Sequence, residues 1–345
     1  MRLFMILAIQ LVFVSSSFAT YINDRGELRR EHFSYDKTSL GKEVLKLQGK
    51  YTDKFFDEWL LSSLKDKKAQ IFMENVFSLF KKKTEIGHNS NKLLGDSDRS
   101  LDKVNCYEYN GACNLFKDVG YQRGTMMLYI FSKYGVNTTH HVTEKYEFLQ
   151  KYNDHQKPFT KEELLAIVIG LDLFGDNIEY FEADKLTMTY ADINKGNTTG
   201  NALIYFFMKW RSTSLVSKVG TVLHEMYHNL AGSYSEYSGK GLRIDSSDEW
   251  MSLHKESRKI VNTNGFDCFV SGYAYTNFAE DAAETLVTYF HNREVLERLC
   301  PQKLEFIDEV ISRADKLRAS KLRRVGRSLG QNLNFLFDSI ENALN

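Results

Sequence analysis

The sequence His224-Glu225-Met226-Tyr227-His228 constrains this chain more than any other feature. The two histidines are four residues apart, so an α-helix places both imidazoles on one face, where they can bind a single metal ion. A match of this length also arises by chance, so the neighbouring residues decide its meaning. Between Thr221 and Leu230 the only charged residue is Glu225, as expected for a helix in a low-dielectric environment. The motif therefore predicts a zinc site.

The apolar residues around this motif predict a helix with one buried stripe. His224 and His228 lie to one side of that stripe, so the helix can pack through its apolar face and still present both imidazoles. Ser212, Thr213 or Ser214 can cap its start, and Gly232 is expected to end it. The stripe consists of Leu215, Val216, Val219, Val222, Leu223, Met226, Tyr227 and Leu230.

A catalytic zinc site needs a third protein ligand besides two imidazoles. Ala231 and Tyr234 stand where a metzincin would have glycine and histidine, which excludes that class. A carboxylate from a later helix is the alternative, and Glu280 and Glu284 are the best candidates. Because they are four residues apart they share a helix face, so one can bind the metal while the other accepts a hydrogen bond from a ligand histidine.

The segment 271–284, placed after this helix, resembles the catalytic domain of the anthrax lethal factor type of zinc peptidases, a gluzincin group. The resemblance covers residues from about 160 to 300. In that family a tyrosine precedes the ligand glutamate by seven residues, and a second glutamate follows four residues later. Tyr273, Glu280 and Glu284 match this pattern position by position.

The resemblance implies an α+β, zincin-like metallopeptidase domain that contains zinc. It departs from the family at 281–283, where Asp-Ala-Ala replaces a commonly aromatic pair. The roles that it implies are zinc ligation by His224, His228 and Glu280, general base catalysis by Glu225 and stabilisation of the oxyanion by Tyr273, which leaves Glu284 to accept the hydrogen bond from a ligand histidine.

Simpler roles are open to the same residues. The histidines could be ordinary hydrogen-bonded side chains, and Tyr273 could be one packed aromatic among 19 tyrosines. Glu280 has capping-box spacing from Asn277, so it could merely start a helix. A purely structural metal site would be closed by a fourth protein ligand, such as Asp281 or His254, whereas a catalytic site keeps that position for water.

The N-terminus reads as a secretory signal. Arg2 is followed by an apolar run from Leu3 to Val14 and by small residues at Ser17 and Ala19. This pattern predicts that residues 1–19 are removed before Thr20. The apolar run is too short to span a bilayer, so no stable membrane insertion is expected after cleavage, and the mature protein should be secreted or periplasmic.

Four cysteines in an exported chain suggest two disulfides, for which three pairings are possible. Cys106 and Cys113 enclose an Asn-Gly turn and could close a small loop. A bond between Cys268 and Cys300 would close a loop of about 32 residues around Tyr273 and Glu280, with a stabilisation of roughly 3–4 kcal/mol. Buried free thiols are the alternative.

The charge composition of the chain limits the classes of molecule that it is expected to bind. The chain has 45 basic and 45 acidic residues, and this balance argues against nucleic acid, which calls for a basic excess. We expect a mainly helical N-terminal region at 20–158, a metallopeptidase domain at 159–300 and a C-terminal helical segment at 301–345.

Within the expected domain, Thr160 and Glu163 form a capping box that opens a helix through about Leu173. Residues 185–190 and 202–209 are expected to form strands separated by a loop.

Together these features predict an exported zinc-dependent metallopeptidase that hydrolyses peptide bonds in a protein or peptide. One alternative is a secreted zinc-binding protein with a structural or degenerate site and no peptidase activity. Another is a zinc hydrolase of some other amide, which would share the chemistry and differ only in its substrate pocket.

Overall fold

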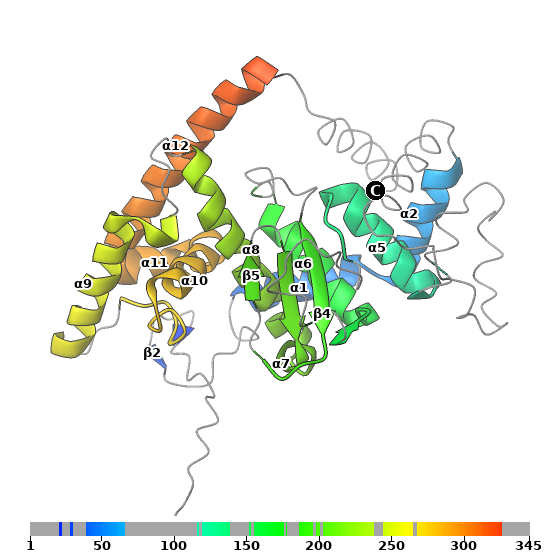
Figure 1. Cartoon of the computed structure of the whole chain (residues 1–345), viewed down its shortest axis with the longest axis horizontal. Coiled ribbons are helices and arrows are strands. Elements are labelled where there is room, and N and C mark those ends of the chain that lie inside the picture. Colours follow the sequence, from blue (N-terminus) through cyan, green and yellow to red (C-terminus); the bar gives the residue numbers. More distant parts are fainter. Residues whose placement is uncertain are drawn as a thin grey trace, which may run out of the picture.

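The computed structural model describes residues 21–22, 28–29, 39–65, 116, 119–138, 152, 155–175, 177, 186–195, 198–200, 203–237, 244–264 and 268–325. Within these ranges helices predominate and surround one small mixed sheet, so the fold class is α+β, as predicted (Figure 1). The principal helices are α1 (Ser39–Lys50), α2 (Asp53–Lys65), α5 (Tyr121–Tyr134), α6 (Lys161–Phe174), α7 (Met208–Arg211), α8 (Leu215–Tyr237), α9 (Asp248–Asn264), α10 (Phe278–His291), α11 (Arg293–Leu299) and α12 (Pro301–Val325).

The sheet has the strand order β3-β4-β6-β5. Its central pair, β4 and β6, is parallel, and each edge strand is antiparallel to its neighbour. A separate antiparallel pair, β1 (Tyr21–Ile22) and β2 (Leu28–Arg29), precedes α1. The strands of the main sheet are β3 (Gln156–Lys157), β4 (Thr187–Ala191), β5 (Thr198–Gly200) and β6 (Leu203–Phe207).

Two details of the predicted strands are wrong. The second strand does not reach Lys209, because the chain turns into α7 at Met208. The polar segment between the predicted strands is not only a loop, because it contains β5, which pairs with β6 at the edge of the sheet. Backbone pairing with a neighbouring strand creates β5, and the hydrophobic pattern does not reveal such pairing.

Alternate side chains of the two central strands pack on opposite faces of the sheet, as the period of a strand requires. Met188 and Ile204 join the main core, which also contains buried residues of α6 and α8. Leu203 and Tyr205 belong to a second cluster on the other face, with Tyr152. The central strands are therefore buried on both faces, and the main core supports the helix that carries the His-Glu-x-x-His motif.

The predicted capping box starts α6. Thr160 Oγ1 accepts a hydrogen bond from the Glu163 backbone N–H at 3.3 Å, and Glu163 Oε2 accepts one from the Thr160 N–H at 2.7 Å. Glu163 is fully buried and also pairs with Arg211, whose Nε lies 2.6 Å from Oε1. The helix ends at Phe174, one residue beyond the predicted end.

Gly170 lets α6 approach α8 closely. A Cβ at this position would lie 2.6 Å from Val222 Cγ1 and 2.9 Å from Val222 Cβ. Val222 is β-branched and fully buried, so its side chain has little freedom to move away.

We expect Gly170→Ala to destabilise the protein by about 1–3 kcal/mol, because overpacking outweighs the gain of about 1 kcal/mol in helix propensity. Gly49→Ala in α1 is the matched control, since a Cβ there meets nothing within 4 Å and should be neutral or stabilising. Denaturant unfolding of both variants measures the difference. Equal stability of the two would show that α8 can shift to accommodate the methyl group.

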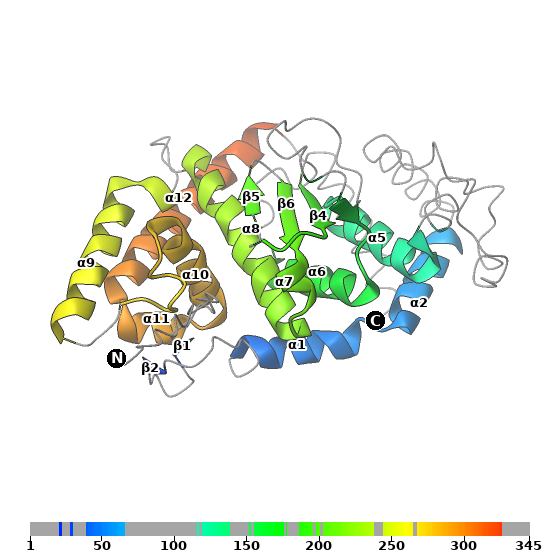
Figure 2. The ribbon, with the colours of Figure 1, turned by 60° about the horizontal axis from the view of Figure 1, so that its bottom comes forward.

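The helix α8 runs between the sheet with α6 and the group formed by α9, α10 and α12 (Figure 2). Ser214 caps its start by accepting a hydrogen bond from the Ser217 N–H at 3.2 Å, which selects one of the three predicted caps. The predicted end is wrong, because the helix continues through Gly232 to Tyr237. The apolar stripe is confirmed: Val219, Val222, Leu223, Met226, Tyr227 and Leu230 are fully buried.

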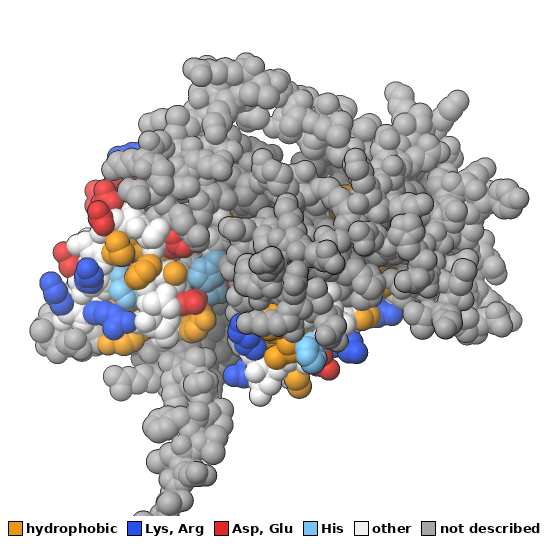
Figure 3. Space-filling model, viewed as in Figure 1, with side chains coloured by type: hydrophobic (Ala, Val, Ile, Leu, Met, Phe, Trp, Pro, Cys, Tyr) orange, Lys and Arg blue, Asp and Glu red, His pale blue; other side chains and the backbone are white. Residues whose placement is uncertain are grey.

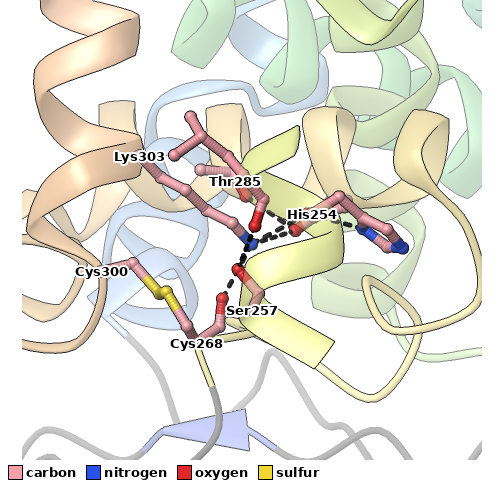
Figure 4. The surroundings of a disulfide bond; sticks show 8 residues. His254, Ser257, Cys268, Thr285, Cys300 and Lys303 are labelled. Atoms are coloured by element: carbon pink, nitrogen blue, oxygen red, sulfur yellow. Dashed lines mark hydrogen bonds and ion pairs between the residues drawn. A yellow bond between two sulfur atoms is a disulfide. The ribbon is translucent and has the colours of Figure 1, made fainter. Parts of the chain in front are cut away.

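A disulfide joins Cys268 to Cys300, with their Cα atoms 5.3 Å apart, which is one of the pairings that the sequence left open (Figure 4). It connects the segment before α10 to the start of α12 and packs in a small cluster with Phe269, Ala274 and Leu296. Cys106 and Cys113 lie outside the described residues, so their pairing stays a prediction.

Loss of the Cys268–Cys300 bond should lower the free energy of unfolding by roughly 3–4 kcal/mol, because the unfolded chain regains the freedom of a loop of about 32 residues. We expect the Cys268→Ser/Cys300→Ser variant to have a lower melting temperature and weaker metal retention than the wild type. Calorimetry and metal analysis measure the two effects. Peptide mapping without reductant that finds both thiols free in the wild type would contradict the prediction.

Helices α1, α2 and α5 and the short strands β1, β2 and β3 lie in the expected N-terminal region, in the part that the structure describes. One core cluster includes residues from α1 through α12, among them Val44 and Ile307, and the boundaries expected near 158 and 300 stay predictions.

The proposed signal segment lies outside the described residues. Among the helices that are described, none is long and apolar enough to cross a bilayer.

Candidate metal centre

Two imidazoles and one carboxylate converge between α8 and α10. The Nε2 atoms of His224 and His228 lie 2.9 Å and 3.1 Å from Glu280 Oε2, and 3.0 Å from each other. Atoms that bind one zinc tetrahedrally at about 2.0–2.2 Å are about 3.3–3.6 Å apart, so a bound ion would require these three atoms to separate by roughly half an ångström. The three residues form a group that could hold a metal ion.

The helix α10 begins with a cap that does not depend on the Glu280 side chain. Asn277 Oδ1 accepts hydrogen bonds from the backbone N–H groups of Ala279 and Glu280, at 2.9 Å and 3.0 Å. The carboxylate of Glu280 contacts the two histidines instead. Of the capping box considered for Asn277 and Glu280, the structure shows the hydrogen bond accepted by Asn277, while the carboxylate of Glu280 is directed to the cluster.

Glu284 lies one turn further along α10 and contacts the other nitrogen of the same imidazole. Its Oε1 is 2.7 Å from His224 Nδ1, and both side chains are buried. When Nδ1 donates this hydrogen bond, Nε2 keeps its lone pair and faces Glu280 and His228. A carboxylate in this position orients a ligand histidine and increases its basicity.

The pKa values in the cluster are set mainly by the contacts between its histidines and carboxylates. Burial disfavours a charged imidazole, but hydrogen bonds from the His224 ring to the carboxylates of Glu280 and Glu284 outweigh it and raise the pKa of His224 well above its usual value. Burial also disfavours a charged carboxylate, yet the two histidines lower the pKa of Glu280 below its usual value. The site therefore favours a negative carboxylate beside positive charge, which a bound cation can supply.

Glu225 lies within the same buried region. It is 6 % exposed, and burial raises its pKa above the ordinary value, while His224 and His228 act in the opposite direction. A carboxylate with a raised pKa next to a cluster of metal-binding side chains can exchange protons closer to neutral pH than a solvated glutamate.

Tyr273 lies beside the cluster at the surface. Its ring centroid is 5.4 Å from that of His224, and the residue is 39 % exposed. Burial of the phenol and the nearby Glu280 raise its pKa, so the hydroxyl keeps its proton and can act as a hydrogen-bond donor. Tyr275 and Phe278 are similarly exposed, and hydrophobic and histidine side chains share the face over α9 and α10 in Figure 3.

The two residues considered as a fourth ligand are engaged elsewhere. Asp281 is fully buried and contacts His254, whose Nδ1 is 2.9 Å from Asp281 Oδ2, and the ammonium group of Lys303. Neither Asp281 nor His254 belongs to the group of metal-binding atoms found among the described residues. His291, at the end of α10, contacts Glu43 at 3.2 Å instead of the cluster.

Sequence reasoning missed Lys303 because its partners are 22 and 35 residues away in the chain. His254, one of its contacts through Asp281, lies in the interior and is 5 % exposed.

Comparisons of the chain with protein-family models, with curated proteins and with solved structures found no match. The likeness to gluzincins carried by Tyr273, Glu280 and Glu284 therefore stays a prediction from the sequence. The geometry of the cluster is independent of that likeness.

Proposed function

We propose that this protein is an exported zinc metallopeptidase of the gluzincin type, with a zincin-like catalytic region. The convergence of His224, His228 and Glu280, with the buried carboxylate of Glu225 on the same helix, is the observation that carries the proposal. The spacing of Tyr273 before Glu280 supports it further.

The donor set favours a transition metal such as zinc over Mg²⁺ and Ca²⁺. Two imidazole nitrogens and one carboxylate oxygen are the ligands of many catalytic zinc sites, whereas Mg²⁺ and Ca²⁺ prefer oxygen alone. Three protein ligands leave a position for water or substrate. Since Asp281 and His254 are occupied by each other and by Lys303, a closed structural site built with them is the less favoured alternative.

The chain's own groups account for the chemistry of peptide hydrolysis. Zinc in such a site acts as a Lewis acid and lowers the pKa of water to near 7. Glu225 takes the proton of the attacking water and passes it to the amine that leaves. Tyr273 donates a hydrogen bond to the oxygen of the scissile carbonyl as negative charge develops there. Glu284 holds His224 in the required orientation.

A peptide substrate also fits the position of the sheet. Strand β5 lies at one edge of the four strands and contacts α8, the helix that carries the histidines. An extended peptide that adds to such an edge gains main-chain hydrogen bonds in register, which suits a protease more than a hydrolase of small amides.

The direct test is cleavage of a mixed peptide library by the purified mature protein, before and after removal of metal with a chelator. We expect cleavage of internal peptide bonds that is lost with the metal and restored by about one equivalent of zinc. Zinc bound at that ratio without any cleavage would favour the non-catalytic alternative, and cleavage that survives complete metal removal would contradict the proposal.

The predicted export is tested by determining the N-terminus of the mature protein. Because small residues at Ser17 and Ala19 define the processing site, the exported protein should begin at or within a few residues of Thr20. N-terminal sequencing of the protein recovered from outside the cytoplasm shows where it starts. A product that retains Met1 would indicate an uncleaved anchor.

A further inference from the structure

A continuous chain of polar side chains passes through the interior beside α10. Arg258 Nε donates to His254 Nε2 at 3.0 Å, and His254 Nδ1 donates to Asp281 Oδ2 at 2.9 Å. Lys303 Nζ donates to both oxygens of Asp281, at 2.7 Å and 2.8 Å. Figure 4 shows Lys303 and His254 approaching this centre from different helices. The four residues, from α9, α10 and α12, are called the polar chain below.

The polar chain includes a charged pair that is removed from water. Lys303 and Asp281 are fully buried, and the ammonium group also lies 4.4 Å from the ring centroid of Phe269. Desolvation of such a pair costs about as much as its attraction returns, and apolar residues of similar volume often stabilise a core as well or better. A contribution to stability alone therefore does not explain the buried pair. The contacts that the polar chain makes with neighbouring segments indicate a different role.

The polar chain holds both ends of the segment that carries Tyr273. Lys303 Nζ donates to the carbonyl oxygen of Cys268 at 2.7 Å. At the other end, Arg258 Nη2 donates to the carbonyl oxygens of Tyr275 and of Thr276, the latter at 3.2 Å. The segment between these contacts is the turn that places the Tyr273 ring against His224.

The same chain also fixes the rotation of α10. Asp281 follows Glu280 directly, so the two side chains leave the helix about 100° apart. Glu280 and Glu284 face the histidines of α8, while Asp281 faces Lys303 and His254. A rotation of α10 that moved Glu280 away from His224 would also break the buried contacts of Asp281.

We propose that Lys303, Asp281, His254 and Arg258 are positioning residues that set the place of Glu280 at the metal site and of Tyr273 beside it. The part that concerns Tyr273 rests on the proposed peptidase function, whereas the part that concerns Glu280 requires only metal binding.

The double variant Asp281→Asn/Lys303→Met tests the proposal. It removes both charges together, so no buried charge is left unpaired and the net charge near the metal is unchanged. We expect the dissociation constant for zinc, measured by competition with a chelator, to rise about 10-fold to 100-fold, the range found when partners of metal ligands are removed. The measurement is made well below the melting temperature, where a loss of global stability alone leaves the affinity unchanged.

Lys218→Met is the matched control. Lys218 is also buried, and its ammonium group binds one carboxylate, that of Glu162, and one backbone carbonyl oxygen, that of Thr213. It lies on the ligand helix α8 but makes these contacts away from α10. We expect this variant to lose stability and to bind zinc with wild-type affinity.

Wild-type zinc affinity in the double variant would overturn the proposal whether or not the protein cleaves peptides. Weakened affinity in the double variant only, in a wild-type protein that cleaves nothing, would support the positioning role and reject the peptidase function. If the double variant does not fold, Arg258→Gln, at the partly exposed end of the polar chain, is measured in its place. A loss of zinc affinity smaller than that expected for the double variant supports the proposal, and unchanged affinity overturns it.

Discussion

Glu225→Gln is expected to reduce peptide cleavage to background while the protein keeps about one equivalent of zinc, because the amide has the shape of the carboxylate but cannot accept the proton of water. Loss of a general base typically lowers kcat by about 10²–10⁴-fold. The side chains of His224, His228 and Glu280 are unchanged, so metal affinity should remain close to that of the wild type. Kinetics and metal analysis on the same preparation measure the two quantities.

The same exchange at an exposed carboxylate is the control. Glu256 lies exposed on α9, and Glu256→Gln should leave both cleavage and zinc content unchanged. Undiminished cleavage by Glu225→Gln would reject the proposed mechanism. A loss of zinc together with cleavage would show instead that Glu225 helps to hold the metal.

Glu280→Ala should lower zinc affinity by more than about 100-fold, since loss of a direct ligand exceeds the roughly 10–100-fold cost of losing an orienting partner. Glu284→Gln, which weakens only the hydrogen bond to His224 Nδ1, should fall within that smaller range. When zinc is limiting, peptide cleavage should decrease from the wild type to Glu284→Gln and further to Glu280→Ala. Isothermal titration or chelator competition gives the three affinities.

The helix cap of α10 allows a further control. Because Asn277 caps the backbone N–H of residue 280, Glu280→Ala leaves the cap intact. Asn277→Ala removes it, at a cost of about 1 kcal/mol in stability and with little change in zinc affinity. Full zinc content in Glu280→Ala would overturn the assignment of this residue as a ligand and with it the gluzincin proposal.

The sequence predicted those parts of the fold that depend on local patterns. The apolar stripe of α8 and the caps at Thr160 and Ser214 arise from contacts within one or two helical turns, so their spacing is visible in the chain. The convergence of His224 with Glu280, 56 residues apart, was also expected, because a catalytic zinc site needs a third ligand from a later segment and the spacing shared with a known family pointed to the same residue.

The errors have physical reasons. Gly232 was expected to end α8, yet one glycine inside a helix costs only about 1 kcal/mol, which the remainder of a long helix can offset. Strand β5 has a polar sequence and owes its conformation to pairing with β6. Lys303 finds Asp281 only when α12 packs beside α10, and no local pattern encodes that approach.

The disulfide divides the candidate site unequally between two parts of the chain. Tyr273, Glu280 and Glu284 lie inside the covalent ring closed by Cys268 and Cys300, and the two histidines lie outside it. In an oxidised but unfolded chain the ring keeps Tyr273 and Glu280 near each other, whereas His224 is not confined with them. The zinc binding that we propose therefore requires that α8 first docks against α10, so the appearance of bound metal during refolding should report the time at which these two helices meet.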